Sequence, residues 1–277
     1  MSIKAIDRDL AQGSTVKTAS ARSRLPVLGY HSVCDTMQDT ITVSLATFRE
    51  QMHWLSEAGI EVISLEEAGR RLDARGPLGG SVVLTFDDGY KDFIEAAVPV
   101  MDDLGFTATV FVISDGFVWP DDPHGRGRLS PEDLRDLRRR RYSIGSHSVS
   151  HARLISLSRS DLDRELIESK ARLEDVLGAA VTTFAYPYGH FGKRERDAVE
   201  HAGYTLACGI GGIWGNGYGT DRLALSRFII SSGQSARDFR SLVLARLKTP
   251  AIRGVLVSEA KRLLRPGIDF ARRRFQT

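Results

Sequence analysis

Short apolar segments alternate with amphipathic segments along most of this chain, and that alternation restricts its fold more than any other feature of the sequence. The apolar segments have few polar breaks, as expected of strands that are buried on both faces. Strands that alternate with helices in this way predict βα repeats around a parallel sheet. We expect strands within residues 25–33, 61–65, 82–84, 107–113, 142–146, 182–185, 205–210 and 223–230, and helices within residues 47–59, 65–72, 91–105, 130–141, 160–177, 192–203 and 235–247.

Length and composition favour one globular domain with a short extension at each end. The chain has 277 residues, of which 42% are hydrophobic and 26% are charged, as in an ordinary soluble protein. We expect a flexible polar segment at residues 1–24, one domain at residues 25–247, and a basic amphipathic helical tail at residues 248–277. Two interpretations of the tail stay open, namely peripheral contact with an acidic membrane surface and packing against the domain.

Charge and targeting signals exclude several classes of protein. The formal net charge is +3, which is too small to indicate nucleic-acid binding. The four arginines at residues 138–141 end a predicted helix, where the helix dipole favours cations. Residues 1–24 lack the apolar core of a secretory signal, and no stretch approaches the ~20 apolar residues of a membrane span. Because Cys34 and Cys208 are too few for a disulfide framework, we expect a reducing compartment and a cytoplasmic location.

Two carboxylates follow the apolar run at residues 82–84. Asp87 and Asp88 come directly before Gly89, where the chain must turn out of the sheet. Asp and Gly are common turn residues, so the segment has a purely structural interpretation. The carboxyl ends of parallel strands are also where α/β proteins build their sites, and this makes both carboxylates candidate site residues.

Two histidines follow another predicted strand. His147 and His151 are four residues apart, and on a helical turn this spacing would place both imidazoles on one side. Together with Asp88 they form a two-histidine, one-carboxylate set, which is an established arrangement for catalytic zinc. We therefore expect Asp88, His147 and His151 to bind a divalent metal, with zinc as the first choice and cobalt or another divalent ion as alternatives.

These segments resemble the motifs of the polysaccharide deacetylase family, which is also called the NodB-homology or carbohydrate esterase 4 group. Thr-Phe-Asp-Asp-Gly at residues 85–89 is similar to the first motif, and His-Ser-Val-Ser-His at residues 147–151 is similar to the second. Ala-Tyr-Pro-Tyr-Gly at residues 185–189 stands in place of a third motif, Arg-x-Pro-Tyr. The resemblance covers about residues 25–247 and implies an α/β fold, a distorted (β/α)7–8 barrel.

The resemblance also implies an activity, which is metal-dependent removal of acetyl groups from N-acetylated sugars. The substrate would be an N-acetylglucosamine unit of an oligosaccharide, an exopolysaccharide or a precursor of one. Asp87 would be the general base, and the backbone N–H of Tyr188, beside Pro187, would face the oxyanion.

Two departures from the family pattern affect the expected roles. Ala185 replaces the arginine of the third motif, so the group that orients Asp87 must come from elsewhere, and Arg227 on the last strand is our candidate. The family's usual Leu-x-His motif is also missing after the third motif. Some members carry that histidine near the N-terminus, and Tyr-His-Ser-Val at residues 30–33 makes His31 the expected general acid.

Other functions stay open on the sequence alone. A related barrel enzyme could hydrolyse a non-sugar amide, an imide or the O-acetyl groups of xylan. A non-haem iron oxygenase uses the same ligand set, although Asp87 would then have no role. A carbohydrate-binding protein with a degenerate site is the third alternative, suggested by Ala185.

Overall fold

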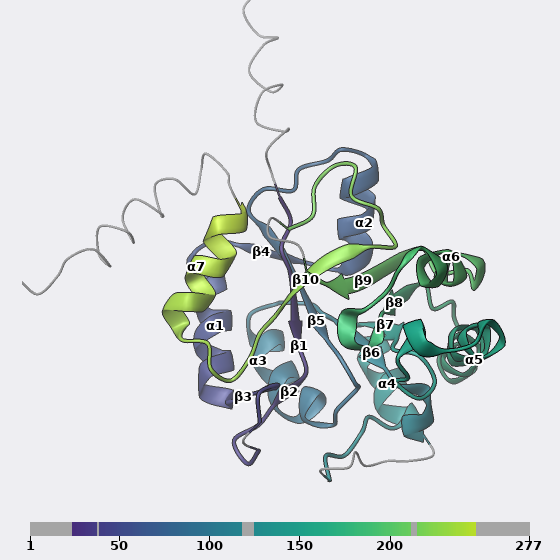
Figure 1. Ribbon diagram of the computed structural model, residues 1–277. Coiled ribbons are helices and arrows are strands. Elements are labelled where there is room, and N and C mark those ends of the chain that lie inside the picture. Colours follow the sequence, from purple (N-terminus) through teal and green to yellow (C-terminus); the bar gives the residue numbers. More distant parts are fainter. Residues whose placement is uncertain (1–23, 38, 118–124, 212–214, 248–277) are drawn as a thin grey trace, which may run out of the picture.

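Seven parallel strands close into a barrel in the computed structural model, which describes residues 24–37, 39–117, 125–211 and 215–247. Around the ring the order is β1, β10, β9, β8, β7, β6 and β5, and β5 then pairs with β1 (Figure 1). The predicted barrel is thus confirmed, with seven strands in the closed ring. An eighth strand, β4 (Glu61–Ile63), pairs with the beginning of β5. The ring strands are β1 (Val27–Tyr30), β5 (Ser81–Phe86), β6 (Thr109–Val112), β7 (Ser143–Ser146), β8 (Thr183–Ala185), β9 (Leu206–Ile210) and β10 (Leu225–Ile229).

Strand β1 completes the ring because it is hydrogen-bonded on both edges. Val27 is in register with Val83 of β5 on one edge and with Arg227 of β10 on the other. Side chains of successive strand residues point to opposite faces, so every second residue points into the barrel. This alternation separates two apolar clusters, and the smaller one includes Val27, Val83, Phe111, Ala185, Cys208 and Leu225.

Helices cover the outside of the ring, and most of the described α-helices begin directly after a serine. Ser44, Ser64, Ser130 and Ser158 each accept a hydrogen bond from a backbone N–H in the first turn of a helix. The helices are α1 (Leu45–Glu57), α2 (Leu65–Asp73), α3 (Val98–Asp103), α4 (Pro131–Arg139), α5 (Arg159–Leu177), α6 (Lys193–His201) and α7 (Ala236–Leu247). A π-helical turn, Phe93–Ala97, precedes α3, so Pro99 lies in the first turn of a new helix, as a residue without an N–H can.

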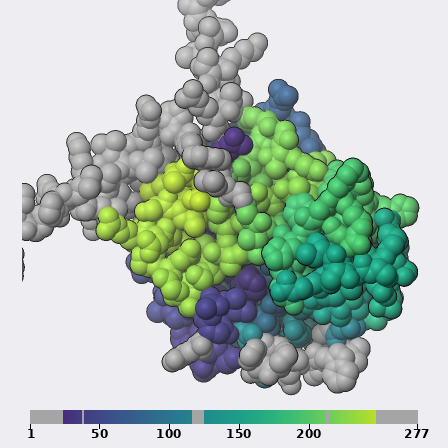
Figure 2. Space-filling view, viewed as in Figure 1, coloured from purple at the N-terminus to yellow at the C-terminus, as the bar shows by residue number. Residues whose placement is uncertain are grey.

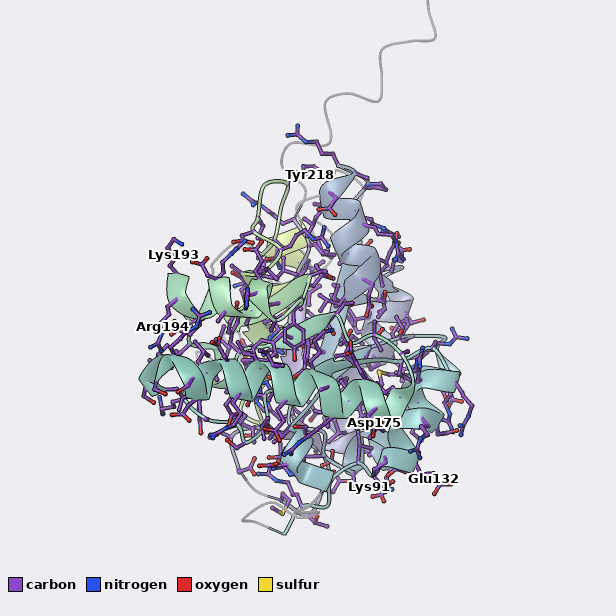
Figure 3. All side chains as sticks on the ribbon, turned by 90° about the vertical axis from the view of Figure 1, so that its right-hand side faces the viewer. Lys91, Glu132, Asp175, Lys193, Arg194 and Tyr218 are labelled. Atoms are coloured by element: carbon purple, nitrogen blue, oxygen red, sulfur yellow. The ribbon has the colours of Figure 1, made fainter. Side chains whose placement is uncertain are left out.

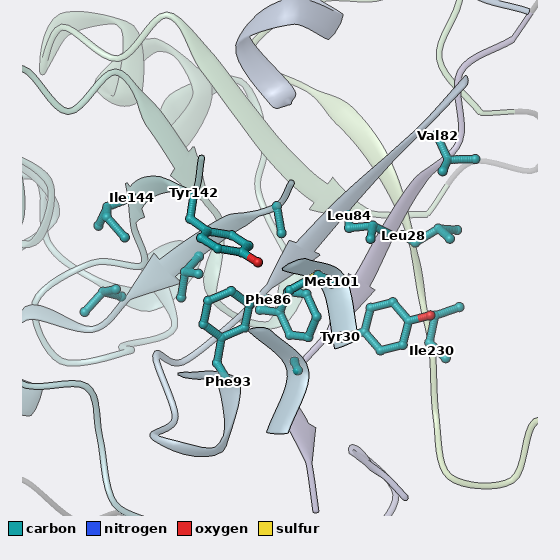
Figure 4. Packing of buried hydrophobic residues seen from close by; sticks show 14 of the residues in the cluster. Leu28, Tyr30, Val82, Leu84, Phe86, Phe93, Met101, Tyr142, Ile144 and Ile230 are labelled. Atoms are coloured by element: carbon teal, nitrogen blue, oxygen red, sulfur yellow. The ribbon is translucent and has the colours of Figure 1, made fainter. Parts of the chain in front are cut away.

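The larger apolar cluster lies between the strands and the helices. Figure 4 shows part of it, with Tyr30 and Phe86 side by side below β1 and β5. Their rings stack with centroids 5.2 Å apart, and Phe93 continues the row 4.7 Å from Phe86. Aromatic rows of this kind contribute area burial and ring–ring attraction together. They hold together β1 and β5, two of the strands that lead into the candidate site.

The last described helix, α7, packs against the first helix, α1, on the outside of the barrel. The ring of Phe239 in α7 meets Trp54 of α1 edge-to-face at 5.9 Å. Figure 2 shows the same relation on the surface, where the yellow α7 segment adjoins the purple N-terminal segments. The sequence did not predict a small second sheet beside these elements, in which β2 (Ser32–Val33) pairs with β3 (Thr42–Val43).

The sequence of the helix at residues 160–177 predicts that its apolar side chains, Leu162, Leu166, Ile167, Leu173 and Leu177, point inward, and this prediction was wrong for Ile167. Leu162 and Leu166 of α5 are buried as expected, but the side chain of Ile167 is 51% exposed. Adjacent helix positions differ by about 100°, so Ile167 cannot share the inward face of Leu166. No helix in the described part of the chain is long and apolar enough to cross a bilayer. The predicted leader and the predicted basic tail fall outside the described residues, apart from residue 24.

Candidate active site

The candidate residues gather at the carboxyl ends of the barrel strands. His31 follows β1, and Asp87 and Asp88 follow β5. His147 follows β7, and Tyr188 lies in a short turn, Pro187–Gly189, after β8. Because parallel strands end at the same rim of a barrel, residues far apart in the sequence meet there.

Asp88, His147 and His151 lie close enough to share one ion. One ligand atom from each residue lies within 4.8 Å of the others. The Nε2 atoms of His147 and His151 are 3.6 and 3.5 Å from Oδ1 of Asp88. That oxygen is buried and has no hydrogen-bond partner in the described part of the chain. A buried carboxylate oxygen without a donor is costly, and a metal ion at this point would satisfy it. These residues therefore fit a divalent cation.

Both histidines are held in a form that can bind a metal. Burial lowers the pKa of His147, although Asp87 and Asp88 oppose the shift. Burial, together with His147, lowers the pKa of His151 to about 4. The imidazoles are therefore neutral near pH 7, as metal ligation requires. Nδ1 of His147 is hydrogen-bonded to the carbonyl of Ala185 at 2.8 Å, which leaves its Nε2 facing Asp88.

The segment between the histidines is not a helical turn, the conformation considered for their spacing in the sequence analysis. Ser148 and His151 have φ of 67° and 60°, which no α-helix allows. Five described non-glycine residues have such positive φ, and four are in this site: Asp88, Ser148, His151 and Tyr188. Strained backbone of this kind is found where surrounding contacts hold functional groups in place. Gly89 continues the left-handed conformation after Asp88, with φ of 68°, which glycine adopts without strain.

Asp87 is bound by an arginine inside the barrel. Nη1 and Nη2 of Arg227 donate to Oδ1 and Oδ2 of Asp87 at 2.6 and 2.8 Å. Burial alone would raise the pKa of Asp87, but Arg227, His147 and His31 together hold it well below its usual range. Strand β1 lies between β5 and β10, and a Cβ added at its Gly29 would come 2.7 Å from Cδ1 of Ile229 and 3.9 Å from Cζ of Arg227. Arg227, the residue that the sequence analysis suggested in place of the third-motif arginine, thus contacts both oxygens of Asp87, and its role in orienting Asp87 stays a prediction.

His31 lies near the same carboxylate. Its Nε2 lies 3.9 Å from Oδ2 of Asp87, as does Nε2 of His147. The Nδ1 atom of His31 is buried and has no partner among the described residues. Nε2 is therefore the nitrogen of His31 that lies near Asp87.

Tyr188 forms the rim beside His151. Its side chain is 42% exposed, and its ring lies 4.6 Å from the ring of His151. The guanidinium carbon of Arg153 lies over the ring of Tyr188, 4.4 Å from the centroid of that ring. Pro187 is buried and begins the turn that carries Tyr188.

Two residues near the site were missed by the sequence analysis. Arg128 donates from Nη1 to the carbonyl of Asp88 at 2.5 Å. Glu165, in the middle of α5, accepts hydrogen bonds from the segment between the histidines. Neither residue belongs to a sequence motif, so only their contacts in the folded chain connect them with the site.

The geometry agrees with a family match. The family model described as polysaccharide deacetylase matches residues 75–207, which contain both carboxylates, both histidines and Tyr188. Over residues 75–207, the chain is similar to polysaccharide deacetylases. This family part lies inside the predicted domain at residues 25–247, whose exact limits stay a prediction.

Relatives by sequence match the same part of the chain. The Bacillus subtilis (strain 168) protein YxkH is 28% identical over 185 residues, which are 66% of this chain and 63% of YxkH. The poly-β-1,6-N-acetyl-D-glucosamine N-deacetylase of Staphylococcus aureus (strain MRSA252) is 24% identical over 172 residues, 58% of this chain and 59% of that protein. The chain thus spans about six tenths of the length of these curated relatives.

Solved structures of deacetylases share the barrel. A Streptococcus pyogenes deacetylase in complex with acetate has a TM-score of 0.73 and 22% identity, covering 80% of this chain and 99% of that one. A polysaccharide deacetylase from Bacillus cereus has a TM-score of 0.67 and 26% identity, covering 79% of this chain and 69% of that one. The chain departs from the third motif of polysaccharide deacetylases at Ala185, which is buried in the smaller apolar cluster.

Proposed function

We propose that this protein is a metal-dependent hydrolase that removes acetyl groups from N-acetylglucosamine units of a polysaccharide or of its precursor. The match of residues 75–207 to the polysaccharide deacetylase family model supports the reaction class. The similarity to a poly-β-1,6-N-acetyl-D-glucosamine N-deacetylase supports the choice of sugar. The observation that carries the proposal is the arrangement at the rim, where a second carboxylate lies beside the Asp88–His147–His151 set.

The three ligand residues would hold the metal. When bound, a divalent ion such as zinc supplies Lewis-acid polarisation and lowers the pKa of water from 15.7 to about 7. Asp88, His147 and His151 would hold the ion as three protein ligands, the number that catalytic zinc sites use. The chain's contribution is to fix these ligands in neutral or anionic form before the metal arrives.

Asp87 is the proposed general base. It takes a proton from the attacking water as the oxygen of that water bonds to the acetamide carbon. Because Arg227 binds both carboxylate oxygens, Asp87 stays ionised and cannot rotate away from the rim. Arg227 is thus a positioning residue, and it supplies from β10 what the third motif supplies elsewhere in the family.

His31 is the proposed general acid. The amide C–N bond breaks only if the nitrogen receives a proton, since an amide anion is a very poor leaving group. A protonated His31 gives that proton through Nε2, the nitrogen that faces Asp87. The products are acetate and a free amine on the sugar. The proton taken by Asp87 and the proton lost by His31 balance over one turnover.

The turn after β8 would border the reacting carbonyl. The backbone N–H of Tyr188 is the proposed donor to the oxyanion, and Pro187 fixes the start of the turn. The left-handed conformation of Tyr188 aims its peptide group differently from that of an ordinary helical turn. Removing one such donor costs about 3–4 kcal/mol of transition-state stabilisation in enzymes where it has been measured.

Acetate release tests the proposal. The purified chain should release acetate from oligomers of β-1,6-linked N-acetylglucosamine in the presence of Zn²⁺ or Co²⁺, and excess chelator should stop the release. Acetylated xylan and a simple non-sugar acetamide serve as comparison substrates at matched acetyl concentration. Faster release from either comparison substrate would reject the proposed sugar amide.

A further inference from the structure

A buried carboxylate from outside the site holds the segment that carries both site histidines. Glu165 lies in the middle of α5, and only 4% of its surface is exposed. Its Oε2 accepts hydrogen bonds from the backbone N–H groups of Val149 and Ser150, both at 2.9 Å. Its Oε1 accepts one from the hydroxyl of Ser150 at 2.7 Å. One side chain thus satisfies three donors in two consecutive residues.

Those two residues are the middle of the connection between His147 and His151. The hydroxyl of Ser148 accepts from the N–H of His151 at 3.0 Å, which closes the turn at its far end. Because the segment is not helical, it cannot satisfy its own N–H groups as a helix would. Glu165 therefore replaces backbone hydrogen bonds that this conformation lacks.

A second contact from α5 holds the beginning of the same segment. The hydroxyl of Ser169, one turn after Glu165, lies 2.8 Å from the hydroxyl of Ser146. Ser146 in turn accepts from the N–H of Ser148 at 3.2 Å. The connection between the histidines is thus fastened to one face of α5 at two levels.

The helix itself does not depend on these polar contacts. Leu162, Leu166 and Leu173 of α5 are fully buried in the main core. Figure 3 shows α5 as the long helix that crosses the face of the molecule, below α6 with Lys193 and Arg194 at its start. Removing the Glu165 carboxylate would therefore leave the helix packed and would release mainly the turn.

We propose that Glu165 is a positioning residue that sets the spacing and orientation of His147 and His151 for metal binding. This inference rests on the proposed metal-dependent function. The two imidazole rings lie 4.8 Å apart, and only a fixed turn keeps both Nε2 atoms directed at Asp88. Groups that support metal ligands in this way commonly change metal affinity by about 10–100-fold when removed.

The test measures metal affinity rather than turnover. Zn²⁺ affinity is determined by competition with a chromophoric chelator, and Co²⁺ absorption spectra report the ligand geometry. Glu165→Ala should weaken Zn²⁺ binding by about 10–100-fold and change the Co²⁺ spectrum. Glu165→Gln should weaken it less, because its amide oxygen can still accept from the two N–H groups. Glu168→Gln is the matched control on the same helix, since Glu168 pairs with Arg172, and it should bind as the wild type does.

Each outcome decides the matter. Circular dichroism first shows which variants are folded. If Glu165→Ala is unfolded, the test uses Glu165→Gln, for which we expect a several-fold loss of Zn²⁺ affinity. A folded Glu165 variant with the affinity and spectrum of the Glu168→Gln control overturns the role of Glu165. His147→Ala separates this from failure of the proposed function. If it binds Zn²⁺ as tightly as the wild type, the metal site itself is wrong, and both proposals fall.

Discussion

Arg227 and Asp87 form a bidentate ion pair inside the barrel, although β10 and β5 are separated by β1. Both side chains are almost fully buried. A buried pair of this kind does not prove high stability, but breaking it leaves one uncompensated charge. The pair is therefore the point at which stability and the proposed chemistry depend on the same two residues.

Removing the arginine should destabilise the fold. Arg227→Ala should lower the free energy of unfolding by about 3–5 kcal/mol, because Asp87 would stay buried without a partner. The double variant Arg227→Ala with Asp87→Ala should lose less than the sum of the two single losses. Urea unfolding measures all three variants, and strictly additive losses would contradict an energetic coupling between the residues.

Neutralising the proposed base should separate metal binding from turnover. Asp87→Asn keeps the shape of the side chain but cannot accept a proton from water. We expect the rate of acetate release to fall by about 10²–10⁴-fold, while Zn²⁺ binding stays close to that of the wild type. Activity near the wild-type level would show that Asp87 is not the base.

Removing a proposed metal ligand should reduce Zn²⁺ binding as well as activity, unlike Asp87→Asn. His147→Ala should lose most Zn²⁺ affinity together with activity, since the buried Nε2 that faces Asp88 is gone. His190→Ala is the control, because His190 is exposed and follows the turn at Pro187–Gly189. Equilibrium dialysis with Zn²⁺ compares the two, and equal metal content in both variants would argue against the assigned ligand.

His31 should matter only when the leaving group needs a proton. His31→Gln should slow release of acetate from an N-acetylated sugar by about 10²–10⁴-fold. Hydrolysis of p-nitrophenyl acetate should change little, because p-nitrophenolate leaves without protonation. A similar loss on both substrates would mean that His31 acts on something other than the leaving group.

The neutral state of His151 should make the stability of the metal-free protein depend on pH. Its pKa is about 4 in the folded chain, below the ordinary value of 6.5 that applies to an unfolded chain. Between these two values the unfolded state binds a proton that the folded state does not, so the free energy of unfolding falls as the pH falls. The difference corresponds to on the order of 3 kcal/mol. Urea unfolding in the presence of chelator measures how much free energy of unfolding is lost between pH 7 and pH 4.5. His151→Gln should lose less than the wild type, and equal losses in the two proteins would contradict the lowered pKa of His151.

Much of the barrel could be predicted because its signals are local. Buried strands and serine-capped helices are each encoded within a few residues, as Ser64 and Ser130 show. The short paired strands β2 and β3 have no such signal, because two residues are too few to show a period. The prediction for Ile167 was wrong because it assigned two adjacent residues, Leu166 and Ile167, to the same buried face of α5.

The candidate site divides in the same way. Asp88, His147 and His151 stand in motifs at strand ends, and parallel topology brings such ends together. The partner of Asp87 could only be suggested, because Arg227 lies on a strand that is not a neighbour of β5 and meets Asp87 only in the closed ring. The sequence does not indicate the role of Glu165, because most acidic residues in a charged helix are exposed to solvent and the burial of this one is known only from the structure.

Metal-loaded crystals test the central claim most directly. Anomalous diffraction at the zinc absorption edge locates the ion without reference to the protein atoms. We predict one strong peak about 2.0–2.2 Å from a carboxylate oxygen of Asp88 and from Nε2 of both His147 and His151, with Asp87 still bound to Arg227. A zinc peak bound by other residues, or none among these three in a crystal soaked with excess zinc, would contradict the account.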